Sequence, residues 1–397
     1  MISVDEATSI ILERAKALPA ETVPLLDAVG RVLAEDVTSD VDLPPFNKSA
    51  MDGFAVRGDD IAATPVELRI TQEITAGDVP SEPISPGECG RIMTGATVPE
   101  GADTVVMVED TEPAGDSAVR ILRSGQRGDN ICARGEDVRT GAVVLRRGHL
   151  LRAAEISLLA SVGCSRPRVH RRPTVAMLAT GDELVDIDTA PGPGQIRDAN
   201  RYAIAASVAA AGCQVIDLGI ARDEPAQVRE RIERGLTSDV LIVSAGVSVG
   251  EYDLVPAALA DAGVKLDFHH IAAKPGRPLL FGSRGGHFVF GLPGNPVSTL
   301  VGLLLFVIPA LRRMAGHTEV VPRAVSAVLD SGLKHKPGRR EYAPCRLRYD
   351  NGIWRAQPIE SHGSADVAAI TRANGLLVMP EEAGELAAGA SAQAIPI

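Results

Sequence analysis

The chain has 397 residues, of which 40 are Lys or Arg and 51 are Asp or Glu, so its formal net charge is −11 at pH 7. At about 150 residues per domain, this length predicts two or three domains, and it is long enough to bury a large core without disulfides or a structural metal. The acidic balance argues against a protein that binds nucleic acid or an anionic membrane, although a local pocket can still hold an anion.

The N-terminal third predicts short helices around a β-rich insertion. Ser3 and Glu6 form a capping-box pattern, and apolar residues recur behind them at helical spacing, so we expect a helix over 3–18 that ends at Pro19. A second short helix is expected over 25–34. From about 41 to 140, short β-type runs alternate with Gly/Pro turns, which is typical of a mostly β domain.

The middle of the chain predicts an α/β domain. Helical character returns at 153–161, and Arg166-Pro167-Arg168 is typical of a linker. From 170 to 316, continuously apolar strands alternate with helices, which indicates a parallel sheet covered on both faces. Strands are expected at 174–179, 214–218, 240–243, 279–282 and 289–291, and helices at 200–211, 224–235, 253–262 and 297–314, the last bent near Pro309.

Short β-type runs return after residue 320 and predict a small C-terminal β domain. The fold class expected from the whole pattern is therefore multidomain, α/β plus β. No fixed-period repeat or low-complexity tract is present.

Cysteine usage and hydropathy indicate a cytoplasmic protein. Five cysteines are spread along the chain without a CxxC pair, which excludes a zinc ribbon or thioredoxin motif and suits a reducing compartment. No signal peptide is predicted, because the first residues lack a cationic segment and an apolar run. The longest run of apolar, Gly and Pro residues, Val301 to Leu311, is shorter than the roughly 20 residues needed to cross a bilayer.

Three distinctive loops directly follow predicted strands of the α/β domain: 180–183 (TGDE), 244–253 (SAGVSVGEYD) and 291–298 (GLPGNPVS). Ligands of open α/β sheets lie at the carboxyl ends of the strands, so we expect these loops to form one anion site. Taken singly, each loop also has a structural interpretation, as a capped strand end, a glycine turn or the start of a helix.

The residue types in these loops suit a phosphorylated ligand with a metal. Gly246 and Gly250 permit close approach of the backbone, and Glu183 and Asp253 are oxygen ligands suited to Mg²⁺. The segment from Lys274 to Arg277 supplies two cations. Other common sites are absent, since no Walker A, HExxH or GxSxG motif occurs.

Eight ordered motifs resemble one family closely: the MoeA-type molybdopterin molybdenumtransferases, related to the gephyrin E domain. The motifs lie between residues 49 and 298 and read SAMDGFA, RIMTGA, RGED, TGDEL, GQIRDAN, SAGVSVGEYD, KPGRP and GLPGNPVS. The resemblance implies a helical/β linker domain (1–45 and 141–169), an inserted β domain (46–140), a molybdopterin-binding α/β domain (170–316) and a C-terminal β-barrel-like domain (317–397). It also implies an elongated homodimer.

The activity implied by the resemblance is insertion of molybdenum from molybdate into adenylylated molybdopterin, with release of AMP and with Mg²⁺ as cofactor. Matching positions imply catalytic roles for Asp52, Thr94, Asp137, Glu183, Asp223 and Asp253, of which Glu183 and Asp253 would hold the metal. They imply substrate binding by Gly246, Ser248, Gly250, Lys274, Arg277, Pro293, Pro296, Arg339 and Ser364. The sequence departs from the family pattern at Ala245, Cys132 and Pro344, among others.

Two alternatives remain open from sequence alone. The α/β domain by itself resembles the molybdopterin adenylyltransferases, although the N-terminal 170 residues and the C-terminal domain argue against that assignment. A non-catalytic scaffold of the gephyrin kind is the second alternative. Further partners implied by the family are the molybdopterin adenylyltransferase and acceptor apo-molybdoenzymes, whereas neither nucleic acid nor membrane is expected as a partner.

Overall fold

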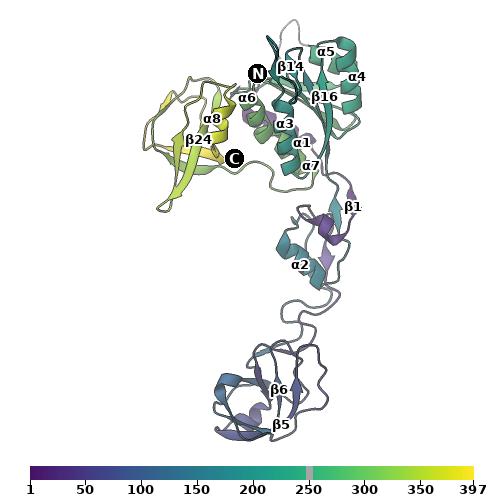
Figure 1. Cartoon of the computed structure of the whole chain (residues 1–397), viewed down its shortest axis with the longest axis vertical. Helices are drawn as coiled ribbons and strands as arrows, with labels where there is room; N and C mark the ends of the chain where they lie inside the picture. The colour runs from purple at the N-terminus through teal and green to yellow at the C-terminus, as the bar shows by residue number, and fades with distance from the viewer. Residues whose placement is uncertain (247–253) are drawn as a thin grey trace.

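The computed structural model describes residues 1–246 and 254–397. The molecule is elongated, with a β-rich part that contains β5 and β6 at one end and the α/β part beside the C-terminal β part at the other (Figure 1). The segment that contains α2 lies between the two ends. The expected multidomain α/β plus β class is confirmed.

The first helix is shorter than the sequence indicates. Helix α1 (Val4–Arg14) begins at the predicted N-cap, where the Ser3 side chain accepts a hydrogen bond from the backbone of Glu6. It ends at Arg14 rather than residue 18, and the Leu18 N–H instead donates to the Met314 carbonyl. The helix expected over 25–34 is a single 3₁₀ turn, η1 (Leu25–Ala28).

The segments before and after the β-rich insertion form one unit. Strand β1 (Ala20–Thr22) pairs antiparallel with β12 (Arg168–His170), and β2 (Val37–Thr38) pairs with β11 (Val143–Leu145). The expected linker at 166–168 therefore runs into a paired strand. Helix α2 (Ala153–Ser161) has the predicted bounds and buries Leu159 against the core of this unit.

The inserted part is built on a six-stranded sheet of order β7-β4-β6-β5-β9-β8. Its strands are β4 (Gly53–Val56), β5 (Val66–Ile74), β6 (Glu88–Ile92), β7 (Thr104–Met107), β8 (Thr111–Pro113) and β9 (Ala118–Ile121). Beside it, β3 (Lys48–Ser49) pairs with β10 (Ile131–Cys132). The β-type runs of the sequence at 67–74, 104–108 and 118–122 correspond to β5, β7 and β9.

The α/β part contains a six-stranded sheet of order β16-β13-β17-β21-β20-β18. Its strands are β13 (Thr174–Thr180), β16 (Gln214–Ala221), β17 (Val240–Ser244), β18 (Lys265–His270), β20 (Pro278–Arg284) and β21 (His287–Leu292). The first four in spatial order are parallel, as expected, but β20 and β18 are antiparallel to their neighbours. The expectation of a parallel sheet is wrong at this edge, because Gly285-Gly286 turns the chain directly back from β20 into β21.

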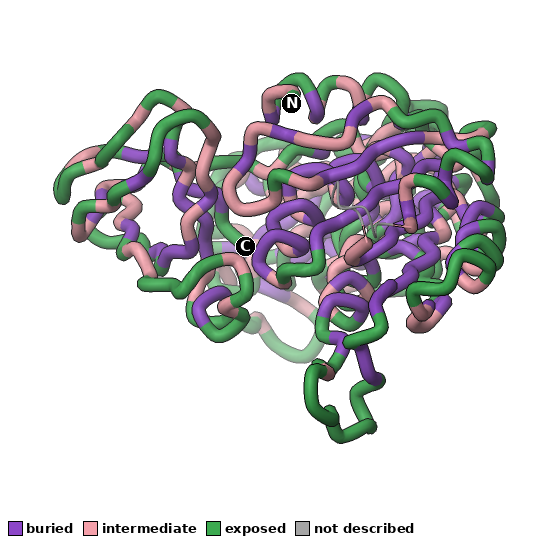
Figure 2. Tube along the Cα trace, turned by 90° about the horizontal axis from the view of Figure 1, so that it is seen from above, coloured by how far each residue is buried: buried purple, intermediate pink, exposed green. Residues whose placement is uncertain are grey.

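Helices cover both faces of this sheet. One face packs against α1, α3 (Asn200–Ala210), α6 (Pro296–Gly302) and α7 (Ile308–Met314), and the other against α4 (Pro225–Gly235) and α5 (Leu254–Asp261). Buried residues concentrate in this layered part when the molecule is seen from above (Figure 2). Between α6 and α7, residues Leu303–Val307 form a π-helical turn just before Pro309, where the sequence predicted a bend.

The combined helix Pro296–Met314 is long and apolar enough to span a bilayer. An apolar stretch of 18 residues within it is 72% buried inside the protein, because α6 and α7 contribute many residues to the largest core. Burial of this kind is typical of a core helix rather than of a membrane span.

The C-terminal part is a small barrel, as expected. Its strands are β22 (Val325–Leu329), β24 (Arg340–Asp350), β25 (Ile353–Pro358), β26 (Gly375–Met379) and β28 (Ser391–Pro396), and pairing of β24 with β26 closes the ring. Helix α8 (Val367–Arg372) precedes β26. The short β19 (Ala273–Lys274) from the α/β part pairs in parallel with β24, which joins the two parts through the backbone.

Candidate functional site

The three loops predicted to form one site begin at the same edge of the sheet. Strands β13, β17 and β21 are adjacent and parallel, and Ala179, Ser244 and Leu292 lie opposite one another in register. The Ala245 N–H donates to the Leu292 carbonyl at 3.0 Å, so the second and third loops are joined at their second residues. The sheet topology therefore brings together the loops that the sequence singled out.

The loop after β17 leaves the sheet through two residues with left-handed backbone. Ala245 has φ 70° and Gly246 has φ 63°. A Cβ atom on Gly246 would lie 2.6 Å from Thr180 Oγ1 and 2.9 Å from a methyl of Val255, so glycine is required there. The same packing buries Thr180 Oγ1, which has no hydrogen-bond partner among residues 1–246 and 254–397.

Asn200, the first residue of α3, connects two of these loops. Its Nδ2 donates to Ser244 Oγ at 3.1 Å and to the Gly294 carbonyl at 2.7 Å. Because a carbonyl only accepts, these contacts fix the orientation of the amide. The Asn200 side chain therefore holds the end of β17 at a set position relative to the GLPGNP loop.

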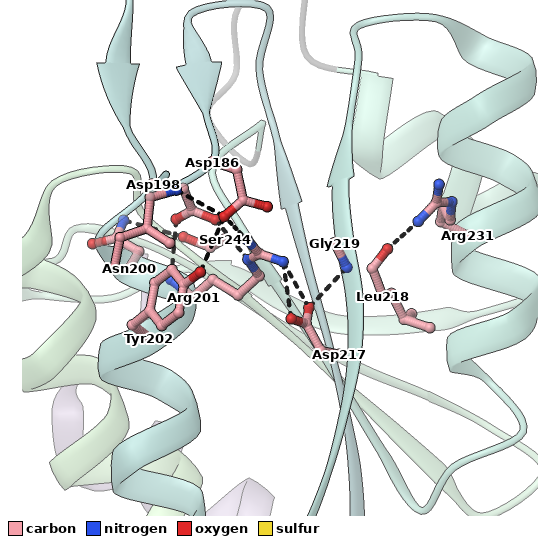
Figure 3. A network of polar contacts seen from close by, with 11 residues as sticks. Asp186, Asp198, Asn200, Arg201, Tyr202, Asp217, Leu218, Gly219, Arg231 and Ser244 are labelled. Carbon is pink, nitrogen blue, oxygen red and sulfur yellow. Dashed lines mark hydrogen bonds and ion pairs between the residues drawn. The ribbon is translucent and has the colours of Figure 1, made fainter. Parts of the chain in front are cut away.

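A buried arginine organises the neighbouring segment (Figure 3). Arg201 donates to Asp198 at 3.0 Å, to Asp217 at 2.9 Å and to Asp186 at 3.3 Å, and its side chain is only 6% exposed. Asp186 follows β14 (Leu184–Val185), which pairs in parallel with β15 (Ile196–Arg197). This network fixes the chain between the TGDE loop and α3 against the edge strand β16.

Exposed carboxylates gather at the ends of β13 and β16. The Asp223 N–H donates to Asp182 Oδ1 at 3.2 Å, and a Cβ on Gly181 would lie 2.4 Å from Glu183 Oε2. Glycine at 181 therefore leaves room for the Glu183 carboxylate to fold back over the turn. Among residues 1–246 and 254–397, no cluster of three His, Cys, Asp or Glu side chains could hold a metal ion by itself.

A cleft of about 1010 Å³ lies where the α/β part meets the barrel. Gly246, Pro293 and Asn295 line it from the α/β side, and Arg339 and Ser364 line it from the barrel. The Asn295 amide donates to Ser364 Oγ at 2.9 Å, and the Val297 N–H donates to the Ser364 carbonyl at 3.0 Å. These bonds join the two walls at one end of the cleft.

Two cations line the same cleft. Lys274 Nζ lies 3.0 Å from Glu341 Oε2, and the Glu341 carboxylate also contacts His335 Nδ1 at 2.9 Å. The Arg339 guanidinium is 3.5 Å from the Ala273 carbonyl. Glu341 is only two residues from Arg339 in the chain, but its ion pair is with Lys274.

A second polar cluster lies in the inserted part. Thr94 donates to Asp52 Oδ1 twice, from its backbone N–H and its hydroxyl, and both distances are 2.7 Å. These two bonds lower the pKa of Asp52 below its ordinary value, and the backbone bond has the larger effect. Asp137 lies on a neighbouring turn, where its N–H donates to the Leu43 carbonyl at 3.0 Å.

Asp42, which the sequence did not single out, orders that turn. It accepts hydrogen bonds from the backbone and hydroxyl of Thr140 and from Arg134, and these contacts lower its pKa to about 2. The Arg134 N–H in turn donates to Asn47 Oδ1 at 2.9 Å. The segment containing Asp137 is thus attached to the segment that leads to Asp52.

The structure places the predicted site residues in two separate groups. Gly246, Lys274, Pro293, Arg339 and Ser364 line the cleft. Glu183 and Asp223 lie at the ends of neighbouring strands, and Pro296 is the first residue of α6. Arg277 is exposed beside His270 and does not line the cleft. Asp253, Ser248 and Gly250 lie outside the described residues.

Asp52, Thr94 and Asp137 form the other group. Asp52 immediately precedes β4, which is the neighbour of β6 in the sheet at the far end of the molecule from the α/β part (Figure 1). One chain therefore does not bring Asp52 and Glu183 together.

Comparisons with known families cover almost the entire chain. Residues 2–163 match the MoeA N-terminal region (domains I and II), residues 176–313 match a probable molybdopterin-binding domain, and residues 326–397 match the MoeA C-terminal region (domain IV). The chain belongs to the MoeA family. This MoeA-family assignment confirms the resemblance found in the sequence motifs.

The similarity of this chain to individual relatives extends over almost their whole lengths. The MoeA-family chain is 37% identical to molybdopterin molybdenumtransferase 2 of Mycobacterium tuberculosis, with 99% of both chains covered. It is 35% identical to the molybdopterin molybdenumtransferase of Haemophilus influenzae, with 98% of this chain and 97% of that one covered. The crystal structure of a molybdopterin biosynthesis moeA protein from Pyrococcus horikoshii superimposes with a TM-score of 0.86 at 30% identity, and the whole of each chain is covered.

Several polar residues at the two clusters of this MoeA-family chain were not recognised from the sequence. Asn200 lay within the GQIRDAN motif, but its contacts to Ser244 and Gly294 depend on the order of strands in the sheet. Glu341 and His335 belong to the barrel, where short β-type runs gave no motif. Their importance follows from the pairing of β19 with β24, which no local pattern indicates.

Proposed function

We propose that the chain is a molybdopterin molybdenumtransferase of molybdenum cofactor biosynthesis. In this reaction adenylylated molybdopterin and molybdate are the substrates: the dithiolene sulfurs displace molybdate oxygen, which leaves as water, and hydrolysis of the phosphoanhydride releases AMP. The observation that carries the proposal is family membership that extends over the front half, the α/β part and the barrel together. The adenylyltransferase alternative accounts for the α/β part alone.

The cleft supplies what two anionic substrates need. Lys274 and Arg339 bring positive charge to its walls although the chain as a whole has a net charge of −11. Ser364 and Asn295 add a hydroxyl and an amide at its end. In this proposal Lys274 and Arg339 bind molybdate, and the strand-end loops with Gly246 bind the adenylylated pterin.

The cleft wall also contains a phenol that carries no charge. Tyr342 lines the cleft, and its hydroxyl keeps its proton at neutral pH as an ordinary tyrosine does; burial raises its pKa further, to about 12. The cationic side chains, rather than this phenol, therefore carry the charge that meets the substrates.

Magnesium fits the carboxylates at the ends of β13 and β16. Mg²⁺ is usually bound by one or two carboxylates plus substrate phosphates, so an open set of oxygen donors suffices. Glu183 is exposed and has space above Gly181, which matches this requirement. Glu183 and Asp253 would hold the ion, and when bound it would neutralise phosphate charge. The Glu183 side chain would help to orient the phosphates.

A homodimer would unite the two groups of site residues. Asp52 and Glu183 lie toward opposite ends of one chain, so a second copy that packs with its inserted β domain against the cleft would complete the site (Figure 1). Mixing Asp52→Ala chains with Glu183→Ala chains should restore activity, because each mixed dimer retains one intact site. Random reassociation gives about a quarter of wild-type activity. Absence of any recovery would argue against a site shared between subunits.

The activity itself is tested with purified protein and adenylylated molybdopterin. Molybdate should trigger release of AMP and formation of a cofactor that activates an apo-molybdoenzyme. An adenylyltransferase would instead consume ATP and molybdopterin to form the adenylylated compound, and a scaffold would do neither. Omitting molybdate is the control that separates transfer of the metal from simple hydrolysis.

The wider setting follows from the same proposal. The molybdopterin adenylyltransferase would supply the substrate, and apo-molybdoenzymes would accept the product, in the cytoplasm. The domain division proposed here is 1–45 with 141–169, 46–140, 170–316 and 317–397. All five cysteines are free, which agrees with a reducing compartment.

A further inference from the structure

The cleft proposed to bind anions contains a carboxylate. The Glu341 side chain is 18% exposed and lines the cleft beside Lys274. A negative charge at this place opposes binding of a dianion unless something neutralises it. The contacts of Glu341 show what does so.

Lys274 and Glu341 are held opposite each other by their backbones. In the parallel pairing of β19 with β24, Lys274 lies in register with Glu341, and Nζ is 3.0 Å from Oε2. Lys274 comes from the α/β part and Glu341 from the barrel, so this ion pair bridges the base of the cleft. The Lys274 side chain is 41% exposed and can turn toward the cleft, whereas the Glu341 carboxylate has a second partner behind it.

That second partner is His335, whose side chain is fully buried. Its Nε2 lies 3.0 Å from the Pro380 carbonyl, which only accepts, so Nε2 carries a hydrogen. Its Nδ1 lies 2.9 Å from Glu341 Oε2. An ionised Glu341 carboxylate accepts a hydrogen bond from Nδ1 as well. The same carboxylate oxygen therefore accepts from both Lys274 and His335.

We propose that Glu341 is an internal competitor for Lys274, and that His335 receives the carboxylate when Lys274 turns to the oxyanion. This inference rests on the proposed function, in which Lys274 binds molybdate. Binding of the oxyanion exchanges the Lys274–Glu341 ion pair for a Lys274–oxyanion pair. Because His335 stays in contact, Glu341 is not left unpaired, and the exchange is reversible. The competition keeps the oxyanion from binding so tightly that its transfer is slowed.

The sign of the effect separates competition from simple positioning of the lysine. If Glu341 competes, Glu341→Gln should tighten molybdate binding by about 10-fold at low ionic strength, since a neutral amide no longer holds Lys274. If Glu341 merely held Lys274 in a productive position, the same change would weaken binding. Molybdate binding to the full chain is measured by titration calorimetry.

Glu360→Gln is the matched control. Glu360 also lines the cleft, and no ion pair or side-chain hydrogen bond of its carboxylate occurs among the described residues. Its replacement removes the same charge from the same cleft without releasing Lys274, so we expect a change of less than about 3-fold. Equal tightening in the Glu360 and Glu341 variants would overturn the competition, because the effect would then be general electrostatics.

Two further variants test the route through Lys274 and His335. Lys274→Ala should weaken molybdate binding, and in that background Glu341→Gln should no longer tighten it. His335→Asn should weaken binding in the wild type but have no effect once Glu341 is Gln. If His335→Asn does not fold, the comparison of Glu341→Gln with Glu360→Gln is sufficient to test whether Glu341 competes for Lys274.

The two proposals fail in different ways. If Lys274→Ala leaves molybdate binding unchanged, the oxyanion role of Lys274 in the proposed function is wrong. If Lys274→Ala weakens binding while Glu341→Gln leaves it unchanged or weakens it, only the competition is wrong.

Discussion

Thr94 donates two hydrogen bonds to one oxygen of Asp52, from its backbone N–H and from its hydroxyl, each 2.7 Å long. The pair joins two motifs that are 42 residues apart in the chain. These bonds favour the ionised carboxylate, with the backbone bond as the larger cause, and they lower the pKa of Asp52. An exposed acid is thereby kept charged and oriented at a turn.

Thr94→Val should raise the pKa of Asp52 part of the way toward its ordinary value, because the hydroxyl bond is lost and the backbone bond remains. A lowered folded-state pKa stabilises the fold above the unfolded pKa, and this contribution is lost as the pH falls through the folded value. As the pH is lowered, the Thr94→Val variant should therefore lose the stabilising contribution of Asp52 at a higher pH than the wild type does. NMR titration of the Asp52 carboxyl carbon measures the shift, and the acid limb of the activity profile should move in the same direction.

Thr75→Val is the matched control. Thr75 donates to Asp78 from its hydroxyl and its backbone, and these bonds lower the pKa of Asp78 in the same way. The control should shift the titration of Asp78 but leave the activity profile unchanged. A shift of the acid limb in both variants would contradict a specific role for Asp52.

The cations of the cleft should govern the requirement for molybdate. A charge-assisted hydrogen bond contributes about 1.5–3 kcal/mol, so Lys274→Ala or Arg339→Ala should each raise the half-saturating molybdate concentration by roughly 10- to 150-fold. Lys265→Ala, which removes an exposed lysine outside the cleft, is the control. If both variants lose only affinity for the adenylylated pterin, these cations bind phosphate instead.

The carboxylate of Glu183 should set the magnesium requirement. Glu183→Gln keeps the shape of the side chain but removes its charge, so the magnesium concentration that gives half-maximal activity should rise about 10-fold. Asp253→Asn should do the same, with little change in thermal stability. An unchanged magnesium titration in both variants would refute this assignment.

We expect Arg201 to stabilise the fold rather than to bind a substrate. Its side chain and that of Asp198 are 6% and 1% exposed, so Arg201→Met leaves a buried carboxylate without its partner and should destabilise the protein by about 3 kcal/mol. Adding Asp198→Asn should recover most of that loss. Arg229→Met is the control, since its ion pair with Asp261 is exposed and contributes about 0–1 kcal/mol. Urea unfolding measures all four proteins.

Replacing Ala245 with glycine should stabilise the folded protein. Its φ of 70° lies in the left-handed region, where a Cβ atom costs about 1 kcal/mol. Ala245→Gly should therefore raise the free energy of unfolding by up to about 1 kcal/mol. Ala206→Gly, at an exposed position inside α3, should lower it by a similar amount. Destabilisation by both changes would show that the backbone at 245 is not strained.

The sequence predicted elements best where hydrophobic periodicity decides the structure. The bounds of α2 and the strands β13 and β17 follow from apolar spacing and continuous apolar runs, and they agree within one or two residues. The antiparallel edge was missed although Gly285-Gly286 lies between two β-type runs, because the alternation of strands and helices elsewhere favoured parallel pairing. Strand β18 was missed because four of its six residues are polar or charged, which gives no continuous apolar run.

The candidate site shows the same division. Motif residues such as Lys274 and Gly246 could be recognised because each lies in a distinctive loop. Asn200, Glu341 and His335 could not be given roles, because their partners are determined by strand order and by contact between the α/β part and the barrel. Those relationships depend on long-range packing, which no spacing in the sequence encodes.

The packing of α1 has a consequence for the order in which the protein folds during synthesis. Val4, Ala7, Ile11 and Ala15 belong to the same core as Leu311 and Met314, and Leu18 donates to the carbonyl of Met314. The first helix to leave the ribosome therefore packs against one of the last core segments to follow it. At 5–20 residues per second, synthesis of the intervening roughly 300 residues takes about 15–60 s. During that time the inserted β domain can fold alone, while the apolar face of α1 remains available to chaperones.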